Sequence, residues 1–511
     1  MRILSSFIAA AALSASACAQ AGQSAPAASL DPERAAAVER VEAVVERFAA
    51  SDYAPPGFSV AVVDADGPLL VRGYGVKDVR TGAPVDARTA FYNASTTKAF
   101  TALAAIRLHE QGRFDLSRSF ANFAPEVALP EPIDPAAVTV RSLLGHSHHI
   151  SAEPVTTYSA FIRRPSANEV FQLVDAFATY DEAEFRYQNT GYVIYDAALQ
   201  RALGVDFRDI VQSEVLDPLG MGETYLRSSE IPAADLAIGH EIGLEGWNTV
   251  APKTDPIMHA AGGMFLSAND MATWLEAQLN EGRIGGEQRI PASAIETSQT
   301  AIVAQSRRLG PLSRHSYAWG WNVGEYDGET LFEHGGGFPG ARAWATFMPE
   351  EDLGVGVLTN VGSGGNMFAV LMYLQIYDAL RGVEGASERL DERLAQLEGF
   401  LERGWESERE YIAEQRALIA GDFEAEDLAA FTGAYFAPEG GELVVAAGEG
   451  GLVGRIGEIR LTFHPTADAD RILGDAGPGY RTYLMAWGVE YDDAGRPVAL
   501  DWDGAVYRRR D

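Results

Sequence analysis

One serine–lysine pair limits what this chain can fold into more than any other feature. Only three of its 40 lysine and arginine residues are lysines, and one of them, Lys98, lies three residues after Ser95. Arginine stays protonated in proteins, whereas the amine of a desolvated lysine can lose its proton and act as a general base. Residues 99–106 are almost entirely apolar, which predicts a buried helix. Ser95 and Lys98 would lie on one face at the start of that helix.

Two further motifs follow this pair in chain order. The three motifs are Ser95-Thr-Thr-Lys98, Tyr187-Gln-Asn189 and His334-Gly-Gly336-Gly337. In this order they resemble the serine β-lactamase and penicillin-binding-protein superfamily, most closely its class C β-lactamase-like branch. That branch carries Ser-x-x-Lys, then Tyr-x-Asn, then a Lys/His-x-Gly strand. The similarity covers roughly residues 35 to 380.

The resemblance implies a role for each residue of the first two motifs. Ser95 would be the nucleophile that forms a covalent acyl-enzyme. Lys98 and the Tyr187 phenol would share the roles of base and proton shuttle, with the division between them left open. A cationic Lys98 would lower the pKa of the Tyr187 phenol. Asn189 would hold Lys98 in place and donate its amide to the substrate carbonyl.

The third motif departs from class C β-lactamases, which carry Lys-Thr-Gly at this point. By analogy, the backbone N–H groups of Ser95 and Gly337 would form the oxyanion hole, and Gly336 would let the substrate approach the strand closely. His334 would be mostly neutral near pH 7, since an unperturbed histidine has a pKa of about 6.5. It would therefore attract a substrate carboxylate less than lysine does. Relatives with histidine here include D-aminopeptidases and esterases.

These features predict an exported serine hydrolase that acts through a covalent acyl-enzyme on small peptides or amides, including those with D-residues, or on carboxylic esters. Two alternatives stay open: a β-lactamase or D-Ala-D-Ala carboxypeptidase, and a non-catalytic binding or regulatory protein on the same scaffold. No cofactor or metal ion is expected. His146, His148 and His149 lack carboxylate partners at familiar metal-ligand spacing, so they are interpreted as a structural loop.

The pattern of strands and helices predicts an α+β fold, an antiparallel sheet flanked by helices with an inserted helical subdomain, over residues 35–385. Its strands are expected at residues 57–63, 68–74, 331–336, 342–348 and 354–360. A polar helical linker is expected over residues 386–427. Residues 428–511 predict a small C-terminal all-β domain, barrel-like or lipocalin-like, whose function stays open.

The N-terminus predicts export to the periplasm or the medium. An apolar run followed by small residues is typical of a signal peptide, here residues 1–19, and a flexible tether is expected over residues 20–34. Cys18, the only cysteine, leaves a lipid anchor open, and membrane contact is expected only in that case. The net charge of -32 disfavours binding to nucleic acid. The expected partner is a small-molecule or peptide substrate, and the oligomeric state stays open.

Overall fold

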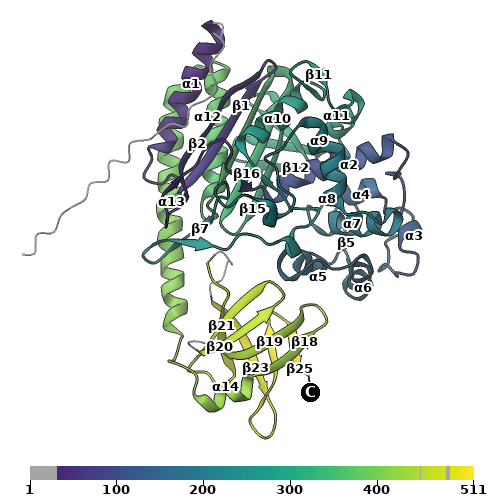
Figure 1. Cartoon of the computed structure of the whole chain (residues 1–511), viewed down its shortest axis with the longest axis vertical. Helices are drawn as coiled ribbons and strands as arrows, with labels where there is room; N and C mark the ends of the chain where they lie inside the picture. Colours follow the sequence, from purple (N-terminus) through teal and green to yellow (C-terminus); the bar gives the residue numbers. More distant parts are fainter. Residues whose placement is uncertain (1–31, 449–450, 479–483, 511) are drawn as a thin grey trace, which may run out of the picture.

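The computed structural model describes residues 32–448, 451–478 and 484–510. The expected signal peptide, Cys18 and most of the expected tether lie outside these residues, whereas residues 32–34 belong to the first helix. Within the described residues, a large body is joined to a C-terminal barrel by one long helix (Figure 1). None of the described helices is both long and apolar enough to cross a bilayer.

The body is built on a nine-stranded antiparallel sheet with the order β12-β13-β14-β15-β16-β17-β1-β2-β3. The strands are β1 (Gly57–Asp64), β2 (Gly67–Asp78), β3 (Ala83–Pro84), β12 (Val303–Leu309), β13 (Leu312–Tyr317), β14 (Asn322–Tyr326), β15 (Glu329–Phe338), β16 (Ala341–Met348) and β17 (Leu353–Thr359). The first and last parts of the body meet where β1 pairs with β17, with Val60 opposite Val357. The antiparallel sheet expected from the sequence is therefore confirmed, with four additional strands, β3 and β12 to β14.

Helices cover both faces of this sheet. They are α1 (Pro32–Ala49) and α12 (Gly365–Leu380) on one face, and α2 (Thr97–Glu110) and α10 (Ala268–Leu279) on the other. Successive residues of a strand point to opposite faces. Accordingly, Val60 and Val62 of β1 pack in an apolar cluster with α1 and α12, while Ala61 and Val63 pack with α2 and α10.

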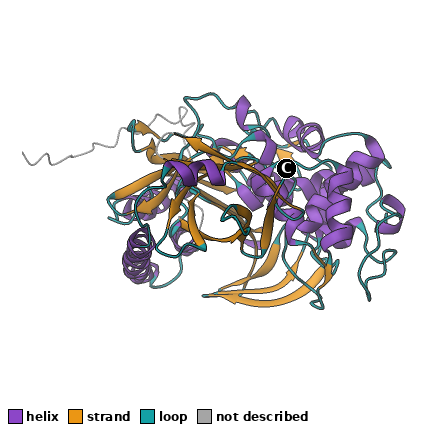
Figure 2. Cartoon of the chain, turned by 90° about the horizontal axis from the view of Figure 1, so that it is seen from below, coloured by secondary structure: helices purple, strands orange, loops and turns teal. Residues whose placement is uncertain are grey.

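A helical subdomain is inserted between β3 and β12, and from below most helices gather on one side of the strands (Figure 2). Its helices are α3 (Phe120–Phe123), α4 (Val140–Leu144), α5 (Glu153–Thr157), η2 (Tyr158–Ile162), α6 (Ala167–Phe177), α7 (Thr190–Leu203), α8 (Phe207–Val211) and α9 (Asp217–Leu219). Local sequence sets their ends. For example, Ser166 and Glu169 form a capping box at the start of α6, and α7 ends at Gly204, whose φ of 68° favours glycine.

The long helix α13 (Ala386–Ala417) leads from the body to the barrel (Figure 1). Leucines recur along its first half at helical spacing and pack on the body: Leu390, Leu394, Leu397 and Leu401. After the short helix α14 (Ala425–Phe431) come the eight strands of a closed barrel. They are β18 (Gly433–Ala437), β19 (Gly441–Gly448), β20 (Gly451–Ile456), β21 (Ile459–Pro465), β22 (Arg471–Asp475), β23 (Leu484–Tyr491), β24 (Pro497–Trp502) and β25 (Ala505–Arg509). The expected all-β domain is therefore a closed barrel.

The barrel is fastened to the body through the turn between β20 and β21. The backbone N–H of Glu458 donates to Ile162 O (2.9 Å), and Thr254 Oγ1 donates to Glu458 Oε2 (2.8 Å). Gly457 has a φ of +56°, and a Cβ atom at this position would lie 2.0 Å from Ile162 O. Only glycine fits this conformation and this distance together.

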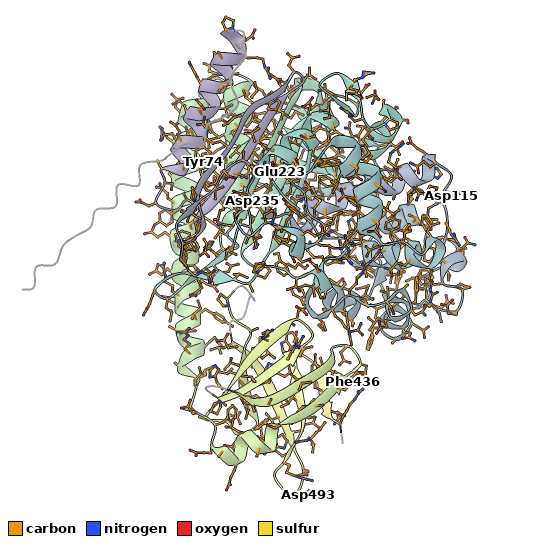
Figure 3. The ribbon with its side chains drawn as sticks, viewed as in Figure 1. Tyr74, Asp115, Glu223, Asp235, Phe436 and Asp493 are labelled. Carbon is orange, nitrogen blue, oxygen red and sulfur yellow. The ribbon has the colours of Figure 1, made fainter. Side chains whose placement is uncertain are left out.

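We expect Gly457→Ala to loosen the barrel and lower the free energy of unfolding by about 1–3 kcal/mol, because the new methyl group collides with the η2 backbone. Gly495→Ala is the matched control. Gly495 also has a positive φ, 75°, but open space around it, and it lies in the β23–β24 hairpin whose tip, at Asp493, is far from the body (Figure 3). Thermal denaturation of both variants measures the difference, and equal losses would contradict the docking role of Gly457.

Candidate active site

Ser95 lies on a short 3-10 turn, η1 (Ala94–Thr96), that leads directly into α2. The residue before it, Ala94, has a φ of 47°, a strained conformation for alanine of the kind found at functional sites. Strand β15 packs tightly against this turn, since a Cβ atom on Gly336 would lie 2.2 Å from Asn93 O. Gly336 therefore brings the strand to the nucleophile, and the next residue, Gly337, is exposed beside it.

Lys98 is completely buried behind the serine. Its Nζ donates to Asn189 Oδ1 and to Ala261 O, both at 2.8 Å. Burial, assisted by repulsion from Lys253, lowers the pKa of the Lys98 amine well below its usual value. A neutral amine has two N–H bonds and one lone pair. In that form both N–H bonds would have acceptors, and the lone pair would stay free.

Tyr187 closes the site from the helical subdomain. It exposes 39% of its surface, yet its hydroxyl is enclosed and lies close enough to Ser95 to interact with it. This enclosure raises the pKa of the phenol, although the interaction with Ser95 acts in the opposite direction. The expected lowering of the phenol pKa is therefore wrong, because burial of the hydroxyl outweighs the effects that would lower it.

Asn189, the last residue of the tyrosine motif, is the N-cap of α7, which begins at Thr190. Its Oδ1 is the acceptor that holds Lys98 Nζ. No residue that the structure describes accepts a hydrogen bond from Asn189 Nδ2, which stays available to a substrate carbonyl. The Tyr-x-Asn spacing thus places one side chain on the serine and the other on the lysine.

His334 ends a chain of three hydrogen-bonded rings at the base of the site. Its Nδ1–H donates to Gly335 O (2.9 Å), so its Nε2 accepts from the Tyr317 hydroxyl (3.3 Å). The Tyr317 oxygen in turn accepts from His146 Nε2–H (3.3 Å), because His146 Nδ1 accepts from the Gln188 N–H (3.4 Å). These partners fix the tautomer of both histidines.

His334 is neutral at every pH at which the protein would work. Only 2% of its surface is exposed, and burial, with repulsion from Lys98, lowers its pKa to about 3. The sequence-based value of about 6.5 is too high because it describes an exposed imidazole. The third motif therefore offers no cation to a substrate carboxylate.

The neighbouring histidines have separate partners. His146 belongs to the ring chain, His148 Nδ1 accepts from Ile150 N–H (3.1 Å), and His149 Nδ1 bonds to Asp181 O (2.9 Å). Within the described part of the chain, no group of three potential metal ligands is found. The sequence interpretation of this segment as a structural loop did not anticipate that His146 packs against the Tyr187 ring, at 4.6 Å between centroids.

Comparison with known families decides the relationship. A family model described as Beta-lactamase matches residues 38–377. The chain belongs to the beta-lactamase family. Among curated proteins it is 25% identical over 367 residues to an unguisins hydrolase of Aspergillus violaceofuscus and 24% identical over 329 residues to the protein flp of Staphylococcus aureus. These alignments cover 66% and 64% of this chain, and 63% of the length of each relative.

Two solved structures share this fold. The octameric penicillin-binding protein homologue from Pyrococcus abyssi aligns with a TM-score of 0.57 and 21% identity over 92% of this chain and 99% of its own. A D-amino acid amidase from Ochrobactrum anthropi, complexed with L-phenylalanine amide, aligns with a TM-score of 0.53 and 21% identity over 71% of this chain and 99% of its own. The first alignment extends beyond the body into the barrel, since it covers more of the chain than residues 38–377.

Asn189→Asp tests whether Lys98 works as a neutral amine. A carboxylate at 2.8 Å from Nζ favours the ammonium and raises the lysine pKa. The neutral, basic form of Lys98 would then be present only at a higher pH than in the unmodified protein. We therefore expect kcat/KM to fall about tenfold or more near pH 7 and to recover toward alkaline pH. Asn189→Ala is the control, because it removes the acceptor without adding charge and should not move the profile to alkaline pH. An unshifted pH profile for Asn189→Asp would show that Lys98 is already charged.

Proposed function

We propose that this protein is an exported serine hydrolase that forms a covalent acyl-enzyme on Ser95. The observation that carries the proposal is the fully buried Lys98 amine, three residues after Ser95, whose acceptors Asn189 Oδ1 and Ala261 O would use both N–H bonds of the neutral form and leave its lone pair free. A purely structural lysine has no need of a lowered pKa, whereas a general base does. Tyr187, whose hydroxyl interacts with Ser95, would supply the proton donor for the second half of the reaction.

The reaction follows from these positions. Lys98 Nζ removes the proton from Ser95 Oγ, which attacks the substrate carbonyl carbon, and the backbone N–H groups of Ser95 and Gly337 stabilise the oxyanion. Asn189 Nδ2 donates to a carbonyl of the bound substrate. Tyr187 gives its proton to the leaving group and regains one from the Lys98 ammonium. Water then attacks the acyl-enzyme with Lys98 again as base, which releases the acid and restores Ser95.

The substrate class follows from the neutral His334. Without a cation on this strand, the site does not favour substrates with a carboxylate on the leaving group, such as β-lactams or D-Ala-D-Ala peptides. We therefore propose carboxylic esters, or small amides and peptides including those with D-residues, as substrates. The names of two solved neighbours, a D-stereospecific amidohydrolase from Streptomyces and the D-amino acid amidase, are consistent with this class.

Ser95→Ala is the direct test of the proposal. We expect it to lower ester or amide turnover about a thousandfold or more and to abolish labelling by a fluorophosphonate probe, because no other nucleophile replaces the hydroxyl. Circular dichroism should show an unchanged fold. Full activity in this variant would refute the proposed function.

Lys98→Arg tests whether Lys98 acts as a base or only as a fixed positive charge. Arginine cannot become neutral, so we expect kcat to fall about 100-fold or more, nearly as far as in Lys98→Met. Stopped-flow measurement of acylation with an activated ester isolates this step. If arginine keeps most of the rate, Lys98 acts only through its charge and Tyr187 is the base.

The substrate class is tested with a panel at pH 7.5. We expect clear hydrolysis of p-nitrophenyl esters or aminoacyl anilides and little or none of a chromogenic cephalosporin, since His334 carries no charge at this pH. His334→Lys should shift the preference toward substrates with a leaving-group carboxylate. Efficient cephalosporin hydrolysis by the unmodified protein, with no action on esters or amides, would contradict the argument from His334.

A further inference from the structure

Lys253 is a buried amine without a counter-charge. Only 3% of its surface is exposed, and its Nζ lies 4.5 Å from the centroid of the Phe338 ring and 5.3 Å from that of Tyr92. It makes no hydrogen bond or ion pair with another residue that the structure describes. By contrast, the buried Lys77 donates to Ala234 O at 2.8 Å and pairs with a carboxylate.

This arrangement is costly unless the ammonium meets a ligand. A buried charge loses its hydration, and the aromatic rings return only part of that free energy. Burial alone lowers the pKa of Lys253 to about 7, so no nearby carboxylate supports the charged form. The chain has 72 aspartates and glutamates, and none of those described is placed beside this amine.

A small cavity lies in front of Lys253, at the end of β15 that follows Gly337. Its volume is about 20 Å³, room for one water-sized group such as a carboxylate oxygen. The wall is formed by Tyr92 and Phe338 together with Ala251 and Pro252, both of which are exposed, so the cavity reaches the surface. Tyr92 is three residues before the nucleophile, and Phe338 directly follows the exposed oxyanion glycine.

The cavity lies on the acyl side of the site. Strand β15 carries His334 at one end of the site and Phe338 at the other. Their Cα atoms are about 13 Å apart, because each residue of a β-strand advances the chain by about 3.3 Å. Gly336, which packs on the nucleophile turn, lies between them. The leaving group takes its proton from Tyr187, whose ring is 5.7 Å from His334. The acyl group must therefore extend the other way, toward Phe338.

We propose that Lys253 Nζ binds a carboxylate on the acyl part of the substrate, with Tyr92 and Phe338 as walls for the short carbon chain in between. The preferred substrates would then be monoesters or monoamides of short dicarboxylic acids. The proposal rests on the proposed function, because it takes Ser95 as the acylated residue. The barrel contacts the segment that carries Lys253, because the hydroxyl of the next residue, Thr254, donates to Glu458.

The test uses binding rather than turnover. In full-length Ser95→Ala protein, saturation-transfer NMR titrations compare N-phenylsuccinamic acid with its neutral counterpart N-phenylbutanamide. We expect the acid to bind at least about tenfold more tightly. Adding Lys253→Met should remove most of this preference, while Lys77→Met, which removes the other non-catalytic lysine, should keep it.

Three results would overturn the proposal. These are equal affinity for the two ligands, a preference that survives Lys253→Met in a folded protein, and a preference lost equally with Lys77→Met. If Lys253→Met does not fold, the affinities of the two ligands are compared instead in Ser95→Ala protein with and without Lys253→Gln. The proposal is then decided by whether Lys253→Gln removes the preference for the acid. Failure of the proposed function is seen separately, as absence of fluorophosphonate labelling at Ser95 in the unmodified protein.

Discussion

The burial of the Lys98 amine is the constraint on which the rest of the site depends. An amine with no exposed surface needs acceptors for its N–H bonds, and it finds them on two separate parts of the chain, at Asn189 and Ala261. Holding these oxygens 2.8 Å from Nζ requires the helical subdomain, the nucleophile helix and the segment before β9 (Phe265–Leu266) to pack together. The sheet supplies the fourth side, where Gly336 lets β15 contact the turn of Ser95.

The same burial shifts the pKa values of the groups around the site. It lowers the pKa of Lys98 and His334 and raises that of Tyr187, which favours the uncharged form of each group. The ring chain through Tyr317 fixes the donor and acceptor atoms of His334. Burial also lowers the pKa of Lys253, which has no hydrogen-bond or ion-pair partner among the described residues, and this missing partner is the basis for the proposed substrate preference.

The barrel contributes to the site indirectly. Its β20–β21 turn contacts η2 and, through Glu458 and Thr254, the segment that carries Lys253. Gly457 makes this contact possible because it has no side chain at a point where a Cβ atom would meet the Ile162 carbonyl. The C-terminal domain therefore contacts the segment that carries Lys253.

The sequence by itself determined the α+β sheet, the all-β C-terminal domain, and the nucleophile helix, because each depends on local periodicity or on spacing within a few residues. It also singled out Ser95, Lys98, Tyr187, Asn189 and His334 as candidates, because their motifs are short and occur in order. Only the tertiary structure shows how burial shifts the pKa values of Lys98, Tyr187 and His334. The rise of the Tyr187 pKa and the size of the fall in the His334 pKa depend on burial by residues that are far away in the chain. It also decided the importance of Tyr317, His146 and Lys253, since a side chain's partners across a sheet or a cavity are set by packing that no local pattern encodes.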